Sequence, residues 1–503
     1  MPLARAWSVA LFGVDGVAVE IEADIGGGRP RTQIVGLPDA SLNEAKERVR
    51  AAIRNSSEEW PGELVTLALS PAALPKGGSG YDLALACAVL VAADRVPTDR
   101  LSGTVMIGEL ALDGRVRPVR GVLPGLLAAR KAGLRRAIVP EPALPEAALV
   151  TGLEILGART LLDTLTWLRG DDAALRTPDP ERVHPPPEIP DLRDVIGQPE
   201  ARWALEVAAA GGHHILLTGP PGTGKTMLAE RLPGLLPPLT DEQALEVTAI
   251  RSIAGTLAPD SPLITVAPFV APHHSTSVSG LIGGGAGMAK PGAISQAHHG
   301  ILFMDEACEF GPHRLESLRT ALEQGEIRLA RRDGVSRYPA NFQLVLATNT
   351  CPCAPPRDSD CTCSPHARRR YFGRLSGPLL DRVDLRVRMR PMTAMSAELD
   401  TPESTAQVRT RVDKARRRAV ERWQQHGWLT NAQAPGPALR REFALPRKTT
   451  ALLDRGLDIG AVTARGADRC LRVAWTLSDL AEADRPGPDH VAAALEFRDR
   501  RAV

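Results

Sequence analysis

Apolar residues dominate two short runs near the start of the chain, and a longer apolar run follows. The two runs, residues 6–14 and 17–25, are typical of β-strands and flank Asp15-Gly16, a dipeptide typical of a two-residue hairpin turn. The unbroken apolar run over residues 83–93 predicts a buried helix. Residues 1–168 therefore predict a first domain of mixed strands and helices, of the α+β class.

The pattern changes after residue 168. Residues 169–190 are rich in helix breakers and include Pro185-Pro186-Pro187, so they predict a stiff linker. Residues 191–392 alternate short apolar strands with helical segments, which is typical of a parallel α/β sheet. Residues 393–503 predict a helical bundle. Its periodic segments cover residues 404–425, 447–457, 464–483 and 488–501. The whole chain is thus expected to be a multidomain α/β protein.

Charge and hydropathy limit how the protein can bind nucleic acid and whether it can enter a membrane. The 503 residues carry 61 basic and 59 acidic side chains, so any nucleic-acid binding must come from local patches rather than from net charge. The longest apolar run is shorter than the ~20 residues of a membrane span. The N-terminus lacks the apolar segment of a signal peptide. We therefore expect a cytoplasmic protein that does not enter a membrane.

A complete phosphate-binding motif follows the apolar strand 214–218. The pattern G-x-x-x-x-G-K-[ST] is formed by Gly219, Pro220, Pro221, Gly222, Thr223, Gly224, Lys225 and Thr226. The glycines let backbone N–H groups face phosphates, Lys225 can reach the β- and γ-phosphates, and the Thr226 hydroxyl can ligate Mg²⁺. The alternative, a plain Gly/Pro loop, does not explain the strand before it and the helix-like run after it. The motif predicts binding of a nucleoside triphosphate with Mg²⁺.

Two acids end a second buried strand, residues 301–304. In nucleoside triphosphatases the first acid at this position, here Asp305, holds Mg²⁺, and the second, Glu306, polarises the attacking water. The alternative is a strand followed by a solvated acidic turn. Together with the phosphate loop, the pair predicts hydrolysis of ATP.

Several further segments show a family resemblance. They are Pro272-His273-His274-Ser275, Gly283-Gly284-Gly285, Pro291-Gly292, Ile294-Ser295 and the run Ser376-Gly377-Pro378-Leu379-Leu380-Asp381-Arg382-Val383-Asp384. With the phosphate loop they resemble the magnesium-chelatase-like branch of the AAA+ ATPases. The fused first domain resembles that of the ComM (YifB) subfamily, and the resemblance covers essentially the whole chain. Departures occur at residues 267–270, at Ala293 and at Thr350, none of which is expected to touch the nucleotide.

The resemblance implies roles for individual residues. Asn349, at the end of the strand 344–348, matches sensor 1, which orients the attacking water. Arg382 matches the arginine finger that reaches the γ-phosphate of a neighbouring subunit, so the active form should be a ring. Arg465 matches sensor 2 and is expected to act in cis; the alternative is a surface arginine at a helix start. Residues 194–198 resemble the segment beside the adenine.

Function follows from the same resemblance. It implies a homohexameric helicase on DNA that promotes branch migration of recombination intermediates in natural transformation, with ATP and Mg²⁺ as cofactors. Two alternatives remain, an AAA+ ATPase that remodels proteins and a magnesium chelatase motor subunit. The second usually works with a D-x-S-x-S metal site, and the nearest match, residues 39–43, fails at its last position.

An arginine-rich hairpin is the candidate DNA contact. Residues 326–343 read as two strands around a turn at Asp333-Gly334, with Arg328, Arg331, Arg332 and Arg337 along them. Repeated around a ring, these arginines would form a positive collar for phosphates. A second cluster lies at residues 368–370. The alternative for each is a solvated basic surface.

One cluster of side chains could hold a metal. Four of the seven cysteines, Cys351, Cys353, Cys361 and Cys363, fall within thirteen residues. They could form a structural Zn²⁺ site or remain reduced loop thiols, and both interpretations stay open. The pairs at 273–274 and 298–299 are adjacent histidines, whose side chains are expected to point apart, so no metal is expected there.

The first domain resembles the Lon protease domain, which is related to the ribosomal S5-like fold. Aligned without gaps, Gly80 stands at the position of the nucleophilic serine, with Ser79 one residue early, and Leu123 stands at the position of the lysine. Leucine cannot accept a proton, so a Lon-like scaffold without protease chemistry is expected. Lys76, on a glycine-rich loop, could instead bind DNA phosphates.

Overall fold

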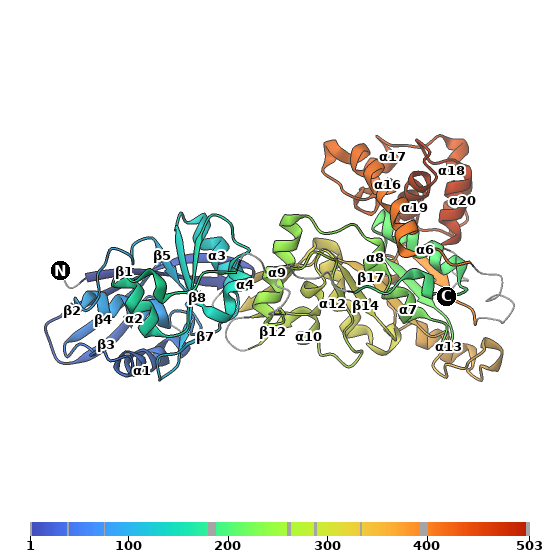
Figure 1. Cartoon of the computed structure of the whole chain (residues 1–503). Helices are drawn as coiled ribbons and strands as arrows, with labels where there is room; N and C mark the ends of the chain where they lie inside the picture. Colours follow the sequence, from blue (N-terminus) through green and yellow to red (C-terminus); the bar gives the residue numbers. More distant parts are fainter. Residues whose placement is uncertain are drawn as a thin grey trace.

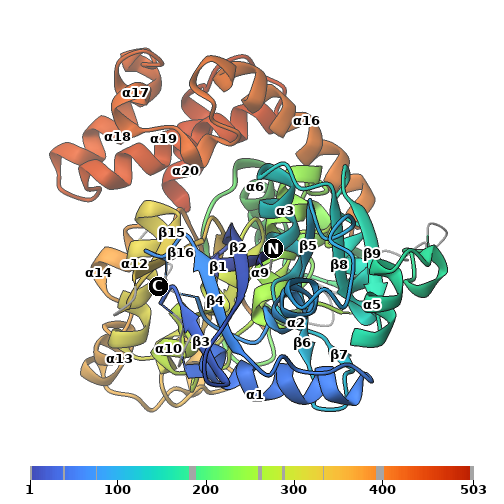
Figure 2. The ribbon, with the colours of Figure 1, turned by 90° about the vertical axis from the view of Figure 1, so that its left-hand side faces the viewer.

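The computed structural model describes residues 3–37, 40–74, 76–179, 188–258, 263–285, 289–331, 334–391 and 401–498. Three units form an elongated molecule (Figure 1). The N-terminal unit (residues 3–179) lies at one end, the central unit (188–391) follows, and the C-terminal unit (401–498) stands on the far end of the central unit. Figure 2, which looks onto the N-terminal unit, shows the C-terminal helices clear of it.

The N-terminal unit is built on a seven-stranded mixed sheet with strand order β3-β4-β2-β1-β5-β8-β9. The strands are β1 (Leu3–Phe12), β2 (Asp15–Gly26), β3 (Arg31–Val35), β4 (Leu64–Ser70), β5 (Thr104–Met106), β8 (Arg136–Pro140) and β9 (Glu154–Ala158). A small hairpin pairs β6 (Glu109–Leu110) with β7 (Val116–Arg117). The helices are α1 (Ala40–Asn55), α2 (Asp82–Ala92), α3 (Val122–Lys131), α4 (Leu144–Ala147) and α5 (Leu161–Leu168). Every residue of α2 is buried, which confirms the buried helix predicted from the apolar run.

The first hairpin turns earlier than predicted. Phe12 pairs with Asp15, so Gly13 and Val14 form the turn, and Asp15 and Gly16 lie in β2. Gly13 takes the left-handed conformation (φ +65°), and a side chain there would collide with the backbone of Arg337 in the central unit. The turn is therefore fixed by a contact between units that no local turn signal reveals.

Part of the predicted linker belongs to the N-terminal unit. Leu175 is buried in the core of that unit, and Arg176 forms a β-bridge with Gly157. Residues 180–187, including Pro185-Pro186-Pro187, lie outside the described residues.

The central unit contains a five-stranded parallel sheet with strand order β11-β14-β17-β10-β18. The strands are β11 (Phe269–Val270), β14 (Ile301–Met304), β17 (Gln343–Thr348), β10 (Ile215–Thr218) and β18 (Leu385–Arg388). Every residue of β10, β14 and β17 is buried, as in a sheet covered on both faces. Two hairpins project from this unit, β12–β13 (Gly283–Gly284 and Lys290–Pro291) and β15–β16 (Glu326–Arg331 and Gly334–Pro339).

Nine helices accompany the sheet in the described part of the central unit. They are α6 (Pro199–Gly211), α7 (Lys225–Ala229), α8 (Leu232–Leu235), α9 (Asp241–Ala254), α10 (Val278–Ile282), α11 (Ala293–Gln296), α12 (Pro312–Gln324), α13 (Pro365–Phe372) and α14 (Gly377–Leu380). Helix α9 packs against α3 of the N-terminal unit.

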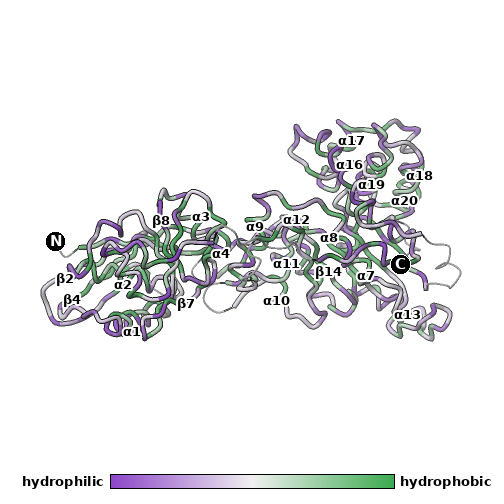
Figure 3. Tube along the Cα trace, in the orientation of Figure 1, coloured by the Kyte–Doolittle hydropathy of each residue, from purple (hydrophilic) through white to green (hydrophobic). Residues whose placement is uncertain are grey.

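The C-terminal unit is helical, as predicted. Its helices are α16 (Thr405–Trp423), α17 (Gly436–Arg440), α18 (Arg447–Asp458), α19 (Ala464–Leu480) and α20 (Pro488–Glu496). Helices α16 and α19 share one hydrophobic core with α6 and β10 of the central unit. The apolar residues, green in Figure 3, lie along the inner elements of all three units. No helix in the described part of the chain is long and apolar enough to cross a membrane.

Candidate nucleotide site

Lys225 and Asn349 meet at the carboxyl ends of neighbouring strands. The phosphate loop leaves β10 and enters α7 at Lys225, whereas Asn349 directly follows β17. The Lys225 ammonium donates hydrogen bonds to Gly219 O (2.7 Å), Pro220 O (2.8 Å) and Asn349 Oδ1 (3.2 Å). Burial lowers the pKa of Lys225, and the nearby charges of Asp305 and Glu306 oppose that shift. The lysine is thus held inside the loop that would cradle phosphates.

Thr226 and Asp305 fit a single magnesium ion. The Thr226 hydroxyl donates to Asp305 Oδ2 at 2.8 Å, and Asp305 Oδ1 accepts the Glu306 N–H at 2.9 Å. An Mg²⁺ ion with Mg–O distances of about 2.0–2.1 Å holds adjacent ligand oxygens roughly 2.9 Å apart. The two oxygens therefore already have the spacing of neighbouring ligands.

Glu306 has an unusual backbone and an unforeseen partner. Its φ of +50° is left-handed, a strained conformation typical of functional sites. His274 Nδ1 lies 3.0 Å from Glu306 Oε2. The contact arises because β11 runs parallel to β14, so the loop after Val270 lies beside the loop after Met304. Sequence analysis missed this role of His274, although it singled out the motif 272–275 as part of the family resemblance.

The segment expected beside the adenine touches the phosphate loop. Gln198 Nε2 donates to Arg390 O (2.6 Å) and to Thr223 O (3.4 Å), and Gln198 itself is left-handed (φ +58°). The neighbouring Ile196 leaves 47% of its surface exposed, which suits an apolar contact with a planar base.

Arg382 and Arg465 lie together in a different place. Both line a cavity of about 220 Å³, with Glu323, Asp381, Asp468 and Arg469 among its other residues. Arg382 forms an ion pair with Glu323 and donates to Pro378 O at 2.6 Å. None of the described phosphate-loop residues lines this cavity. The structure therefore brings Arg465 to Arg382, whereas the cis role expected for Arg465 stays a prediction.

A buried aspartate joins this arginine pair to β10. Asp384 follows Arg382 by two residues, and it accepts hydrogen bonds from Arg469 Nη1 (2.6 Å) and from the backbone N–H of His214 (3.1 Å). Burial opposes the ionisation of Asp384, but Arg469 and His213 hold its pKa well below the usual range. The arginine cavity is thus tied to the strand that carries the phosphate loop.

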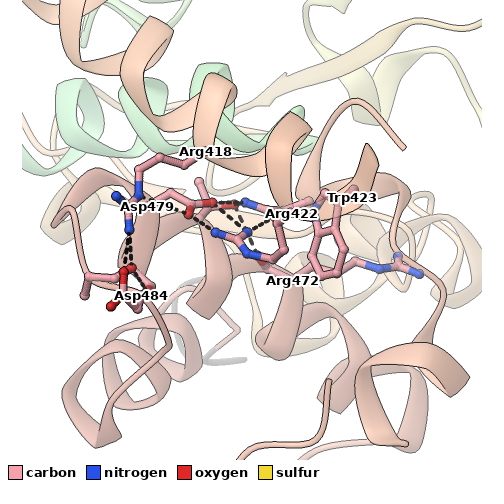
Figure 4. Close-up of polar contacts among 10 residues, drawn as sticks. Arg418, Arg422, Trp423, Arg472, Asp479 and Asp484 are labelled. Atoms are coloured by element: carbon pink, nitrogen blue, oxygen red, sulfur yellow. Dashed lines mark hydrogen bonds and ion pairs between the residues drawn. The ribbon is translucent and has the colours of Figure 1, made fainter. Parts of the chain in front are cut away.

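A second buried aspartate fixes α19, the helix that carries Arg465 in its first turn. Asp479 lies between Arg418 and Arg422, with Trp423 beside them (Figure 4). Arg422 donates to both carboxylate oxygens of Asp479 and stacks over the Trp475 ring at 4.4 Å. Asn431 also donates to Asp479 (2.9 Å). These contacts lock α16 to α19 and so set where Arg465 lies.

Comparisons with known proteins show the family of this chain. Family models of the magnesium chelatase subunit ChlI match residues 21–143, 191–397 and 402–498, the last through its C-terminal model. The competence protein ComM of Haemophilus influenzae is 38% identical over 507 residues, covering 99% of this chain and 98% of that protein. The uncharacterized protein YifB of Escherichia coli is 39% identical over 500 residues, covering 99% and 97%. The chain belongs to the magnesium-chelatase-like ComM/YifB family. An uncharacterized protein of Mycobacterium tuberculosis is 57% identical over 505 residues, covering all of both chains.

Membership of the ComM/YifB family suggests ATPase activity with ATP and Mg²⁺, which the geometry of Lys225, Thr226 and Asp305 fits.

The arginine hairpin of this ComM/YifB protein has one buried and one exposed face. Ile327, Leu329 and Tyr338 are buried, whereas Arg328 and Arg337 are exposed and lie directly opposite each other across the strands. Glu326 pairs with Arg328. Like charges placed opposite each other destabilise a hairpin unless an anion neutralises them.

The turn of this hairpin also differs from the prediction. Gly334 pairs with Arg331 and so lies in β16 rather than in the turn. Arg332 and Asp333 lie outside the described residues, and the structure describes only the backbone of Arg331. The second cluster, residues 368–370, lies on α13, at the end of the central unit away from the N-terminal unit (Figure 1).

The four cysteines of the loop after Asn349 lie close together. The Sγ atoms of Cys351, Cys353, Cys361 and Cys363 all lie within 4.8 Å of one another.

Neither histidine pair points apart, contrary to the expectation: the ring centroids lie 4.1 Å apart in His273-His274 and 3.9 Å apart in His298-His299. His299 is left-handed (φ +54°), so both rings lie on one side, and both Nε2 atoms approach Glu246 Oε2, at 3.1 and 2.8 Å. His298 Nδ1 accepts the Asn341 N–H at 3.0 Å, so the neutral ring carries its proton on Nε2 and donates it to Glu246. This tautomer favours hydrogen bonding over metal ligation at His298.

The residues at the Lon-like positions are mostly buried. Lys76 is fully buried, and its ammonium donates a hydrogen bond to Pro71 O. Contrary to the expectation, it therefore does not present its charge to DNA phosphates. Leu123 is buried, and Ser79 donates to Glu109.

Proposed function

We propose that this chain is an ATP-driven ring motor on DNA, a hexameric helicase that promotes branch migration of recombination intermediates. The observation that carries the proposal is the division of its ATPase residues between two places. Lys225, Thr226, Asp305, Glu306 and Asn349 converge at the phosphate loop. Arg382 and Arg465 line a separate cavity.

At the phosphate loop, Lys225 binds the β- and γ-phosphates once they displace the loop carbonyls from its ammonium. Thr226 and Asp305 hold Mg²⁺, which neutralises phosphate charge when bound. Glu306 orients the attacking water, and Asn349 positions it from the adjacent strand end. His274 holds the Glu306 carboxylate in one orientation.

Arg382 and Arg465 serve the nucleotide of the neighbouring subunit. An arginine supplied in trans stabilises the charge spread over the transferring phosphoryl oxygens. Because both side chains line one cavity, a nucleotide reached by Arg382 would also be within reach of Arg465. We therefore place both arginines in trans, which replaces the cis role expected for Arg465. Head-to-tail contacts of this kind close into rings.

Support for DNA comes from the hairpin and from the name of one relative. The exposed face of β15–β16 presents Arg328 and Arg337 side by side, a pair that backbone phosphates would neutralise. The relative from Haemophilus influenzae is named a competence protein. The N-terminal unit is proposed to be a Lon-like, S5-related scaffold without protease chemistry, because Leu123 replaces the lysine base.

The test is ATP-dependent migration of a synthetic four-way junction by the purified protein. We expect the wild type to resolve the junction and Lys225→Ala to fail. The double variant Arg328→Gln/Arg337→Gln should lose DNA-stimulated ATP turnover while keeping DNA-independent turnover. A matched control, Arg115→Gln, removes an exposed arginine of the N-terminal unit that pairs with Asp113. ATP hydrolysis that no DNA substrate stimulates would overturn the DNA assignment and favour protein remodelling.

A further inference from the structure

The loop between Asn349 and α13 has almost no core of its own. Of residues 350–364, the structure describes only Cys351 and Pro355 as buried, and the rest of the loop is mainly polar or proline. A loop of this length without apolar packing needs another source of order, such as a cross-link or a metal. Among its described side chains, the four cysteines lie close enough together to supply one.

The four thiols already have the dimensions of a tetrahedral site. The Sγ–Sγ distances are 3.3 Å (Cys351–Cys353), 3.4 Å (Cys351–Cys361) and 3.7 Å (Cys353–Cys361), and Cys363 Sγ completes the group within 4.8 Å. A zinc ion with Zn–S bonds of about 2.3 Å places its sulfur ligands roughly 3.8 Å apart. A disulfide would need sulfurs about 2.05 Å apart, so the observed spacing fits ligands of one ion and not bonded pairs.

The charges around the sulfurs fit the same assignment. Arg357 and the three arginines in the middle and last turn of α13, residues 368–370, lie within a few positions of the cluster in sequence and can offset the net charge of −2 that Zn²⁺ with four thiolates carries.

We propose that Cys351, Cys353, Cys361 and Cys363 bind one structural Zn²⁺ ion. All four tetrahedral positions are filled by protein, so the ion has no open position for catalysis. It closes the loop that leaves the nucleotide site at Asn349 and returns through α13, whose Tyr371 hydroxyl lies 3.3 Å from Thr348 Oγ1. The zinc site thus holds sensor 1 and the arginines of α13 in a fixed relation.

The direct test is metal content of the full-length protein purified with a reductant and measured by inductively coupled plasma mass spectrometry. We expect about one zinc per chain. The double variant Cys351→Ser/Cys361→Ser should lose it, and Cys87→Ala, which removes a buried thiol of α2, should keep it. Cobalt bound by the wild-type chain should show the visible absorption bands of a tetrahedral tetrathiolate, a readout that needs no variant to fold.

The proposal is overturned if the reduced wild-type chain takes up neither zinc nor cobalt and its four loop thiols react with a thiol reagent as freely as exposed cysteines. A second readout rests on the proposed ATPase. Zinc loss should lower kcat severalfold with little change in KM for ATP, because Lys225 and Thr226 lie outside the loop. Zinc binding without any ATPase would leave this site established and refute only the proposed function.

Discussion

The phosphate loop and the arginine cavity are assembled in opposite ways. The phosphate loop is a contiguous motif, and its partners Asp305 and Asn349 meet it because the ends of neighbouring parallel strands share one edge of the sheet. Arg382 and Arg465 lie on different units, and only the packing of α19 against the central unit brings them together. The first site can be derived from local sequence, whereas the second depends on tertiary structure. Motifs therefore predict the chemistry proposed for both sites, whereas the proposed trans role of Arg465 depends on the three-dimensional arrangement.

The largest expected effect separates the two sites. Arg382→Ala should lower kcat for ATP by about 10³–10⁵-fold, the range for an arginine finger, while ATP binding at the intact phosphate loop is retained. Steady-state turnover and binding of a fluorescent ATP analogue measure the two quantities. Arg455→Ala, an exposed arginine of α18, is the control and should change neither. Loss of ATP binding in Arg382→Ala would place this arginine at its own chain's nucleotide.

Lys225→Ala is the matching change at the phosphate loop. It should lower kcat by about 10²–10³-fold, because it removes a buried cation from the phosphates, and it should also weaken ATP binding. The same two assays apply. A Lys225→Ala protein with unaltered affinity for ATP would contradict the assigned contact.

Asp479→Ala tests the support of the arginine cavity. The substitution leaves Arg422 without its buried carboxylate, so unfolding of the C-terminal unit should cost about 3–5 kcal/mol less. Urea unfolding followed by tryptophan fluorescence reports this directly, since Trp423 and Trp475 lie beside Arg422. The control Asp484→Ala removes the exposed partner of Arg418 and should leave the midpoint unchanged. Equal midpoints for both variants would show that Asp479 does not hold α19.

His274→Ala tests the contact that sequence analysis missed. Release of the Glu306 carboxylate should lower kcat by about 10- to 100-fold with little change in KM, because a misplaced base affects the chemical step. His273→Ala is the matched control, since it removes the neighbouring ring, which hydrogen-bonds Ser275 and lies against His274, while leaving the His274–Glu306 pair in place. Equal activity of both variants would reduce the His274 contact to packing.

The smallest expected effect is on the pH dependence of stability, and it concerns His298, which lies just before β14, the strand that ends next to Asp305. Burial lowers the pKa of His298 to about 4, with a smaller contribution from His299, and Glu246 opposes the shift. A histidine with a depressed pKa binds fewer protons in the folded state than in the unfolded state. Its contribution to the free energy of unfolding is therefore complete above pH ~6.5 and declines as the pH falls toward 4. The decline is at most about 1.4 kcal/mol per pH unit. His298→Asn, which keeps an acceptor for the Asn341 N–H, should flatten this slope in urea unfolding. An unchanged slope would refute the assignment of this pH dependence to His298. The control is His366→Asn on α13, which should leave the slope as in the wild type.

Sequence could predict what local pattern determines. The four periodic segments of the C-terminal unit, the buried helix α2 and the phosphate-loop motif all depend on residues that are close together in the chain. The turn at Gly13 could not be predicted, because a contact with Arg337 selects it over Asp15-Gly16. The rings of His298 and His299 point in the same direction because the backbone of His299 is left-handed, and a pair of adjacent histidines in a sequence does not predict this conformation.

Mixing two inactive variants tests the central claim most directly. Lys225→Ala supplies intact arginines, and Arg465→Ala supplies an intact phosphate loop. If Arg465 acts in trans, a randomly mixed ring should restore ATP hydrolysis at about a quarter of its interfaces, as should a mixture of Lys225→Ala with Arg382→Ala. If Arg465 acts in cis, the mixture with Arg465→Ala should remain inactive while the Arg382→Ala mixture recovers, and the shared trans role of the arginine cavity would be wrong.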